Sequence, residues 1–248
     1  MQDFAPDSPL AVAHPSPNHG DRDEQVPRAI ILHYTGMKTG AAALERLRDP
    51  ASEVSAHYVV EEDGRIFQLV PEARRAWHAG KSSWAGETDM NSASIGIEIV
   101  NGGHDFGNPA FPDAQIEAVI ALCRDIAQRY GIPPQDILAH SDIAPERKAD
   151  PGELFPWAKL ASAGVGHYVP PHPLGPDAGL SLGDEGAEVW NLQRKLVAYG
   201  YGLDVTGVYD DQTEKVVIAF QRHFRPARID GKADLSTLKT LQDLLASS

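Results

Sequence analysis

Three side chains in this sequence are of the types that bind a catalytic metal ion. His33 ends one apolar run, His140 ends another, and Asp150 follows in the next loop. Two imidazoles and one carboxylate form a donor set that zinc accepts in catalytic sites, where a water keeps the fourth position. That water ionises near neutral pH and becomes a nucleophile. The alternative stays open at this point, because the chain has 10 histidines and a single histidine is more often structural or at the surface.

Two charged residues favour hydrolysis of a carbonyl compound at such a site. Lys148 lies two positions before Asp150, and side chains two apart in an extended segment point the same way. Its ammonium group can then stabilise charge on a carbonyl oxygen. Glu98 interrupts the apolar pattern SIGIEIV, where burying a carboxylate is costly unless the site uses it. It can take a proton from water and pass it to a leaving amine. The alternatives are a solvated lysine and a strand glutamate that faces water.

The apolar patterns around these residues predict strands and helices in alternation. The expected strands are 27–34, 55–61, 66–70, 94–100 and 137–140, and the expected helices are 40–48 and 113–130. The turn Glu62-Asp63-Gly64-Arg65 makes a hairpin of the second and third strands. Such alternation predicts an α/β domain, which we place at residues 25–163.

The segments on either side of this domain differ in composition. Residues 1–24 are rich in Pro, Asp and His and have neither a basic nor an apolar region, so we expect a flexible leader and not a secretory signal peptide. Residues 164–180 are rich in Pro and Gly, which is typical of a linker. Three helical patterns follow in residues 181–248 and predict a small three-helix domain.

The overall composition excludes several classes of function. The net charge of -13 disfavours nucleic acid and anionic lipid, because binding them depends on cationic side chains. The single cysteine, Cys123, excludes an intrachain disulfide and fits a buried helix position. No run reaches the ~20 apolar residues that a transmembrane helix needs.

Several motifs, taken together, resemble a known family. They are ILHYTG around His33, the hairpin VSAHYVVEEDGRIFQLV, AWHAG at 76–80, NSASIGIEIVN at 91–101 and AHSDIAPERKADPG at 139–152. Their order and spacing resemble the bacterial type 2 N-acetylmuramoyl-L-alanine amidases over about residues 25–160, most of all the AmpD/AmiD-like branch. The resemblance implies a mixed central sheet flanked by helices. It also implies hydrolysis of the amide between N-acetylmuramic acid and L-alanine in peptidoglycan or its muropeptide fragments.

The resemblance also assigns roles to residues. His33, His140 and Asp150 match the ligands of one zinc ion per chain, Glu98 matches the catalytic glutamate, and Lys148 matches a lysine that assists the tetrahedral intermediate. Asp150, where some relatives have Cys, favours the AmpD/AmiD-like branch. His57 matches a histidine beside the hairpin strand and is expected to be structural or to support the site without binding the metal. Three residues lie in the region that resembles the substrate cleft, namely Trp77, His78 and Trp84, and Asn101 follows the Glu98 strand. All four are expected to contact substrate, although the tryptophans fit a core equally well.

The C-terminal segment resembles a peptidoglycan-binding domain of the three-helix type. The sequences LSLGDEGAEVWNLQRKLVAYGY and DVTGVYDDQTEKVVIAFQRHF carry this likeness, and Tyr209-Asp210 stands where that family usually has Phe-Gly. We expect peptidoglycan as its partner; the alternative is a packing or dimerisation domain.

Two other classes of function compete with an amidase. A non-catalytic peptidoglycan receptor can share this fold, but the complete ligand set with Glu98 and Lys148 favours an enzyme. A glycosidase would need a second acid near Glu98, and no motif supplies one. A polymer-binding module favours the bacterial cell envelope, the periplasm, although no signal peptide is visible; the cytoplasm is the alternative. The choice between intact sacculus and released 1,6-anhydro fragments stays open.

Overall fold

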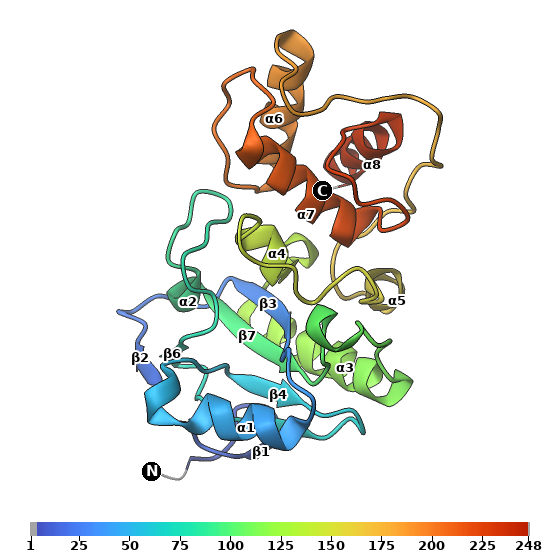
Figure 1. Cartoon of the computed structure of the whole chain (residues 1–248). Coiled ribbons are helices and arrows are strands. Elements are labelled where there is room, and N and C mark those ends of the chain that lie inside the picture. Colours follow the sequence, from blue (N-terminus) through green and yellow to red (C-terminus); the bar gives the residue numbers. More distant parts are fainter. Residues whose placement is uncertain (1–3, 248) are drawn as a thin grey trace.

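The computed structural model describes residues 4–247, which form a sheet-containing lobe and a helical lobe (Figure 1). The strands are β1 (Ala11–Ala13), β2 (His19–Asp21), β3 (Ala29–Tyr34), β4 (Tyr58–Val60), β5 (Ile66–Gln68), β6 (Arg74–Ala76), β7 (Ser94–Ile99) and β8 (Ile137–Ala139). The helices of the first lobe are α1 (Gly40–Arg48), α2 (Met90–Ala93), α3 (Asp113–Tyr130), α4 (His140–Ile143) and α5 (Trp157–Ser162). Those of the second lobe are α6 (Ala187–Tyr199), α7 (Asp211–Phe224) and α8 (Leu235–Ala246).

The central sheet is mixed, as the family resemblance implies. Its strand order is β1-β5-β4-β7-β3-β8, and β2 pairs with β6 in a separate small sheet. Strands β4, β7, β3 and β8 are mutually parallel, whereas β5 runs antiparallel to β4 in the predicted hairpin. The carboxyl ends of parallel strands meet at one edge of a sheet, which is where α/β proteins bind ligands. His33 near the end of β3 and His140 directly after β8 are therefore brought to the same edge.

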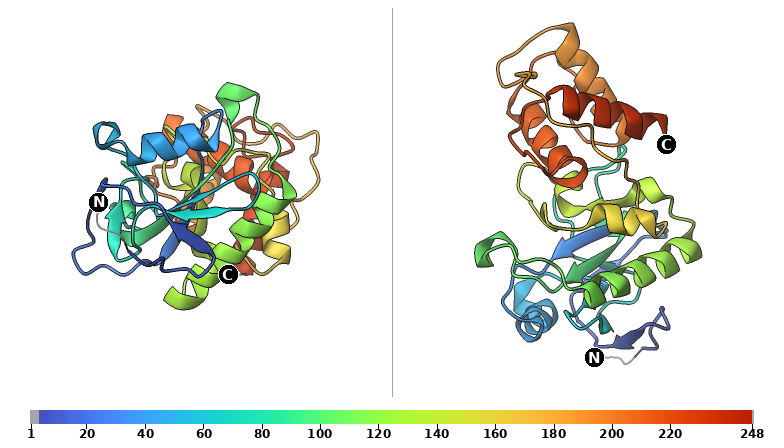
Figure 2. Two further views of the ribbon diagram at one scale, coloured as in Figure 1. Left: turned by 90° about the horizontal axis from the view of Figure 1, so that it is seen from below. Right: turned by 90° about the vertical axis from the view of Figure 1, so that its right-hand side faces the viewer.

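Alternation along the strands separates the two faces of the sheet. The isoleucines of β7 belong to the core that packs against α3, as Tyr58 and Val60 do. Val59 belongs instead to the core that includes Leu47 of α1. Helices α1 and α3 accordingly cover opposite faces (Figure 2, left). Because Val59 is in register with Glu98, the glutamate lies on the α1 face, opposite its isoleucine neighbours, as the sequence predicts.

The predicted helices 40–48 and 113–130 are present with these bounds. Thr39 caps α1 by accepting a hydrogen bond from the Ala42 N–H at 3.2 Å. Helix α3 ends at Gly131, whose φ of 67° is the left-handed conformation that a glycine adopts easily. Cys123 is fully buried in the apolar stripe of α3, also as predicted.

The prediction of a flexible leader over residues 1–24 is wrong for the described part; residues 1–3 lie outside the described residues. Strand β1 pairs with β5, and β2 pairs with β6. Arg22 is 4% exposed and donates hydrogen bonds to the carbonyls of Glu72, Ser92 and Ser94. Hydrogen bonds of buried polar side chains hold this segment in place. Because these bonds are made with residues far away in the sequence, the polar composition of the segment did not indicate an ordered structure.

The second lobe is a three-helix unit whose core continues into the first lobe. Its central apolar side chains come from all three helices: Leu192, Leu196, Phe220, Phe224, Leu241 and Leu244. The same core includes Ile143 of α4 and Trp84, which contacts Tyr199 and Tyr201. Figure 2 (right) shows the helical lobe on the α4 side of the sheet. Within residues 4–247, no helix combines the length and apolar character needed to cross a membrane.

Candidate active site

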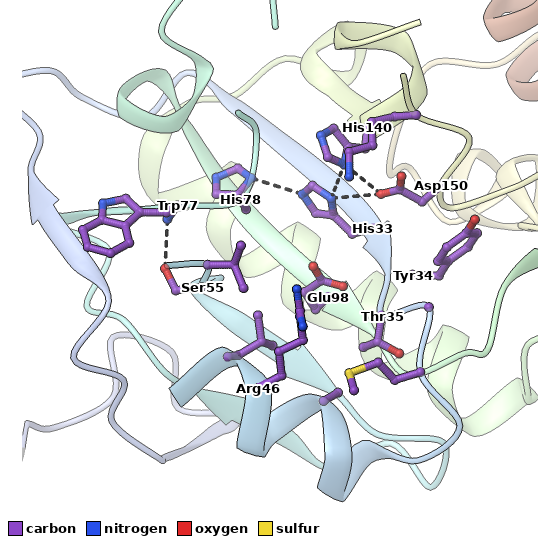
Figure 3. A pocket seen from close by; sticks show the side chains of 16 residues that line it. His33, Tyr34, Thr35, Arg46, Ser55, Trp77, His78, Glu98, His140 and Asp150 are labelled. Atoms are coloured by element: carbon purple, nitrogen blue, oxygen red, sulfur yellow. Dashed lines mark hydrogen bonds and ion pairs between the residues drawn. The ribbon is translucent and has the colours of Figure 1, made fainter. Parts of the chain in front are cut away.

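His33, His140 and Asp150 converge at the carboxyl edge of the sheet (Figure 3). The His33 Nδ1 and His140 Nδ1 atoms are 2.8 Å apart, and Asp150 Oδ2 lies 3.0 and 2.9 Å from them. All three side chains are buried. These three atoms, which we call the ligand triangle, were predicted to converge although they are far apart along the chain.

Hydrogen bonds on the far side of each ring fix which nitrogen faces the triangle. His140 Nε2 donates to the Ala79 carbonyl at 3.1 Å, so Nδ1 keeps its lone pair. His33 Nε2 lies 3.1 Å from Nδ1 of His78, whose Nε2 faces Ser94 Oγ at 3.4 Å. With a proton on Nε2 of His78, its Nδ1 accepts from His33, and His33 Nδ1 also keeps a lone pair. Such outer hydrogen bonds orient metal-binding histidines in proteins.

The ligand triangle fits a divalent ion by its chemistry. Two imidazole lone pairs and one carboxylate oxygen point at a common space, and one proton cannot satisfy all three acceptors. Burial and the neighbouring His140 lower the pKa of His33 to about 4, which keeps its imidazole neutral and able to bind metal. Burial alone would raise the pKa of Asp150, but the adjacent His140 and His33 imidazoles hold it well below its usual range. The donor set N2O is one of those that zinc takes in catalytic sites.

Glu98 lies beside the ligand triangle, in register with His33 on the adjacent parallel strand. Its Oε2 is buried, and among residues 4–247 it has no hydrogen-bond partner. Burial, followed by repulsion from Asp150, raises the pKa of Glu98 to about 8, while Lys148 acts in the opposite direction. A carboxyl group with a pKa near neutrality can both accept and donate a proton under physiological conditions.

A pocket of about 300 Å³ opens over these groups. Its lining includes the ligand triangle, Glu98, Lys148, Trp77 and His78, together with residues of α1 and of the loop after β3. Arg46 of α1 lines the same pocket (Figure 3), and no hydrogen bond or ion pair of its guanidinium group occurs among the described residues. Sequence reasoning missed Arg46, because the helical pattern of 40–48 does not say which turn of α1 faces the site.

The four predicted substrate contacts lie in different places. Trp77 lines the pocket, and its backbone N–H donates to Ser55 Oγ at 2.9 Å. His78 also lines the pocket, but its ring supports His33. Trp84 is instead buried between the lobes, where its Nε1 donates to Asp136 at 3.0 Å. Asn101 organises the loop after β7, accepting from the Gly103 N–H and donating to the Pro109 carbonyl. Only the first two are positioned to touch a ligand in this pocket.

Comparison with known proteins agrees with this fold and site. Residues 23–153 match the family described as N-acetylmuramoyl-L-alanine amidase, and residues 185–241 match a family described as putative peptidoglycan binding domain. The chain therefore belongs to the N-acetylmuramoyl-L-alanine amidase family.

Several relatives match over most of this chain. N-acetylmuramoyl-L-alanine amidase AmiD of Escherichia coli (strain K12) is 38% identical over 88% of this chain and 82% of its own. The structure of the E. coli AmiD complex with anhydro-N-acetylmuramic acid-L-Ala-D-gamma-Glu-L-Lys matches with a TM-score of 0.76 and 37% identity, covering 90% of this chain and 91% of that one. The crystal structure of AmpDh3 from Pseudomonas aeruginosa matches with a TM-score of 0.75 and 33% identity, covering 100% and 99%.

These findings confirm the predicted class of protein. The chain is an enzyme of cell wall turnover that hydrolyses the amide bond between N-acetylmuramic acid and L-alanine. The alternative of a non-catalytic receptor is not supported by these matches. The mixed α/β fold with additional C-terminal helices is confirmed as well.

Proposed function

We propose that the amidase depends on one zinc ion held by His33, His140 and Asp150, with Glu98 as the catalytic acid and base. The observation that carries this proposal is the buried Oε2 of Glu98, which has no hydrogen-bond partner in the described part of the chain and lies beside three converging atoms of metal-binding types. Zinc in such a site lowers the pKa of a bound water to near neutrality and polarises the carbonyl that is attacked. Glu98 takes the proton of the attacking water and then delivers it to the alanine nitrogen, so that the amide C–N bond breaks.

Lys148 stabilises the negative charge that develops on the carbonyl oxygen. It lines the pocket together with Glu98 and the ligand triangle, and its backbone N–H donates to the Ala144 carbonyl at 3.0 Å, which anchors the loop. A fixed cation beside a developing oxyanion contributes more to the transition state than to the ground state.

Arg46 binds the stem peptide in this proposal. The ligand of the E. coli AmiD complex continues from L-Ala to a γ-linked D-Glu, and a γ linkage leaves the α-carboxylate of that residue free. Arg46 lines the pocket with a guanidinium group that has no partner among residues 4–247, and guanidinium is the partner that carboxylates prefer. The D-Glu α-carboxylate is then held by Arg46 on one wall of the pocket, and the scissile amide lies at the ligand triangle on another. Holding the ligand at both places orients the scissile carbonyl toward the ligand triangle. Trp77 supplies an apolar wall of the same pocket.

We further propose that residues 164–180 link an amidase domain at 25–163 to a peptidoglycan-binding domain at 181–248. The matches to relatives that act on peptidoglycan favour the cell envelope as the place of action. A polymer-binding lobe favours the intact sacculus over free fragments as substrate.

The experiment that tests the assignment uses Glu98→Gln, which keeps the size of the side chain and removes its proton chemistry. Purified sacculi and soluble anhydro-muropeptides are digested with and without a chelator, and the products are identified by mass spectrometry. We expect turnover to fall by about 10²- to 10⁴-fold with zinc still bound. Near-normal turnover by Glu98→Gln would rule out its role as base.

Two matched comparisons sharpen this test. Lys148→Met is expected to lower kcat, whereas Lys81→Met, which removes a lysine from a different pocket, is expected to change it little.

Arg46→Met is expected to lower kcat/KM by about tenfold for a muropeptide with a free α-carboxylate. The same substitution should have little effect when that carboxylate is amidated; equal losses on both substrates would contradict the assigned contact.

A further inference from the structure

A buried carboxylate joins the two lobes next to the ligand triangle. Asp142 lies in α4 and is 1% exposed. Its Oδ2 accepts hydrogen bonds from the Ala139 N–H at 2.8 Å and from His223 Nδ1 of α7 at 2.7 Å. Its Oδ1 accepts a third from the Tyr201 hydroxyl at 2.8 Å. Two of the three donors therefore belong to the C-terminal lobe, and Figure 1 shows α4 between the sheet and that lobe.

The same segment fixes two of the three metal-binding residues. His140 is the first residue of α4, and the hydrogen bond from the Ala139 N–H to Asp142 holds the turn from β8 into this helix. The Ser141 N–H donates to the Asp150 carbonyl at 3.0 Å, which ties the second ligand to the same turn. Helix α4 has only 4 residues, so its own backbone hydrogen bonds give it little rigidity. Its orientation therefore depends on contacts outside the helix.

Aromatic packing fixes the two donors of the C-terminal lobe. Tyr201 contacts the edge of Trp84 with ring centroids 5.1 Å apart. His223 stacks on Trp157, with centroids 3.7 Å apart and an interplanar angle of 23°. Both tryptophans belong to the first lobe, so each donor is held against it by an apolar contact as well as by its hydrogen bond. Backbone contact continues this interface, because the Ala85 N–H donates to the Gly200 carbonyl at 2.8 Å.

We propose that Tyr201 and His223 are positioning residues for the metal site. Through their hydrogen bonds to Asp142, the C-terminal lobe helps to hold His140 and Asp150 in place. The lobe thereby has a role in the amidase site in addition to binding polymer. A buried charge needs all of its donors, and losing one allows the α4 turn to shift toward another partner. The inference rests on zinc binding at the ligand triangle, as proposed above.

The test measures zinc affinity of the full-length apo protein by competition with a chromophoric chelator. Tyr201→Phe keeps the ring and its contacts and removes only the hydroxyl. We expect zinc to bind about tenfold more weakly, the lower end of the range for residues that support metal ligands from outside the coordination sphere. We expect kcat at saturating zinc to fall as well, while KM changes little, because the pocket wall formed by α1 is untouched.

A second pair of variants separates the hydrogen bond from packing. His223→Asn retains a donor close to the position of Nδ1, whereas His223→Leu removes it. We expect His223→Asn to keep most of the zinc affinity and His223→Leu to lose about as much as Tyr201→Phe. This rescue by the conservative variant is not expected from a purely structural role, because both substitutions lose the stacking contact with Trp157.

The matched control is Tyr209→Phe. Tyr209 is fully buried in the C-terminal lobe and its hydroxyl donates to the Gly231 carbonyl, so the chemical loss is the same but lies away from Asp142. We expect a similar loss of thermal stability with unchanged zinc affinity. If Tyr201→Phe also binds zinc as the wild type does, the positioning role is refuted. If the wild type itself binds no zinc, the proposed metal site fails instead.

Discussion

Gly96 of β7 gives a direct test of how the sheet supports the proposed metal site. A Cβ added there would lie 2.4 Å from Cγ, 2.5 Å from Nδ1 and 2.6 Å from Cδ2 of His78. Ordinary contact begins near 3.4 Å, so the imidazole must move by about 1 Å. Because His78 Nδ1 lies 3.1 Å from His33 Nε2, a shift of that size breaks the hydrogen bond that orients His33.

Gly96→Ala is therefore expected to have two measurable effects. Overpacking of this kind costs about 1–3 kcal/mol, and in a chain of this length each kcal/mol lowers the melting temperature by about 2–4 °C. Zinc affinity should fall by about tenfold, because His33 loses an outer hydrogen bond. Differential scanning calorimetry of the apo protein measures the first effect, and chelator competition measures the second.

The sign of the effect should depend on His78. In a His78→Ala background the ring is gone, so the added methyl group fills space and Gly96→Ala becomes neutral or stabilising. Gly20→Ala is the control, since its nearest atom is Trp77 Nε1 at 3.8 Å and little change is expected. Equal destabilisation by Gly96→Ala in both backgrounds would mean that the two positions are independent and would refute the reasoning.

Three further outcomes follow from buried groups elsewhere in the chain. Burial and the nearby Arg22 hold the pKa of His57 well below its ordinary 6.5, so only the unfolded state binds a proton there. The free energy of unfolding should therefore fall as pH drops below about 6.5. Denaturant titrations of the apo protein should show a flatter pH dependence for His57→Gln. Phe220→Ala should cost about 3–5 kcal/mol in the core of the C-terminal lobe, measured by denaturant unfolding. Arg129→Met should cost about 3–5 kcal/mol in the same measurement, because it removes the cation that pairs with the buried Glu72 carboxylate. Wild-type stability in this variant would show that the Tyr58 hydroxyl alone satisfies Glu72.

Local patterns in the sequence were sufficient for the elements that carry the chemistry. The period-two alternation of β7 placed Glu98 opposite its isoleucines, and the apolar runs of β3 and β8 placed His33 and His140 at strand ends. Both depend on near neighbours along the chain, which periodicity records. Asp150 was predicted from its residue type and from the family resemblance of its loop motif, and its place beside both imidazoles agrees with that prediction.

What the sequence did not reveal depends on contacts between distant segments. Trp84 looked like a cleft residue because AWHAG precedes it, yet it is buried against Tyr201, more than a hundred positions later. Arg22 gives no local sign that its guanidinium group will be buried among carbonyls from 72–94. Asp142 likewise looks like an ordinary loop carboxylate until α7 is packed against it. In each case tertiary hydrogen bonds, and not propensity or period, determine the environment.

The two carboxyl groups in the pocket, Asp150 and Glu98, differ in pKa because their neighbours differ. Asp150 lies against two imidazoles, and its pKa is held low, so it stays ionised and available as a ligand. Glu98, buried without such a partner among the described residues, has its pKa raised to about 8. A divalent ion at the ligand triangle would add positive charge nearby and would lower the pKa of Glu98 from that value toward neutrality. Holding one carboxyl group ionised and leaving the other close to neutral pKa is the arrangement in which a metal ligand and a proton carrier can work side by side.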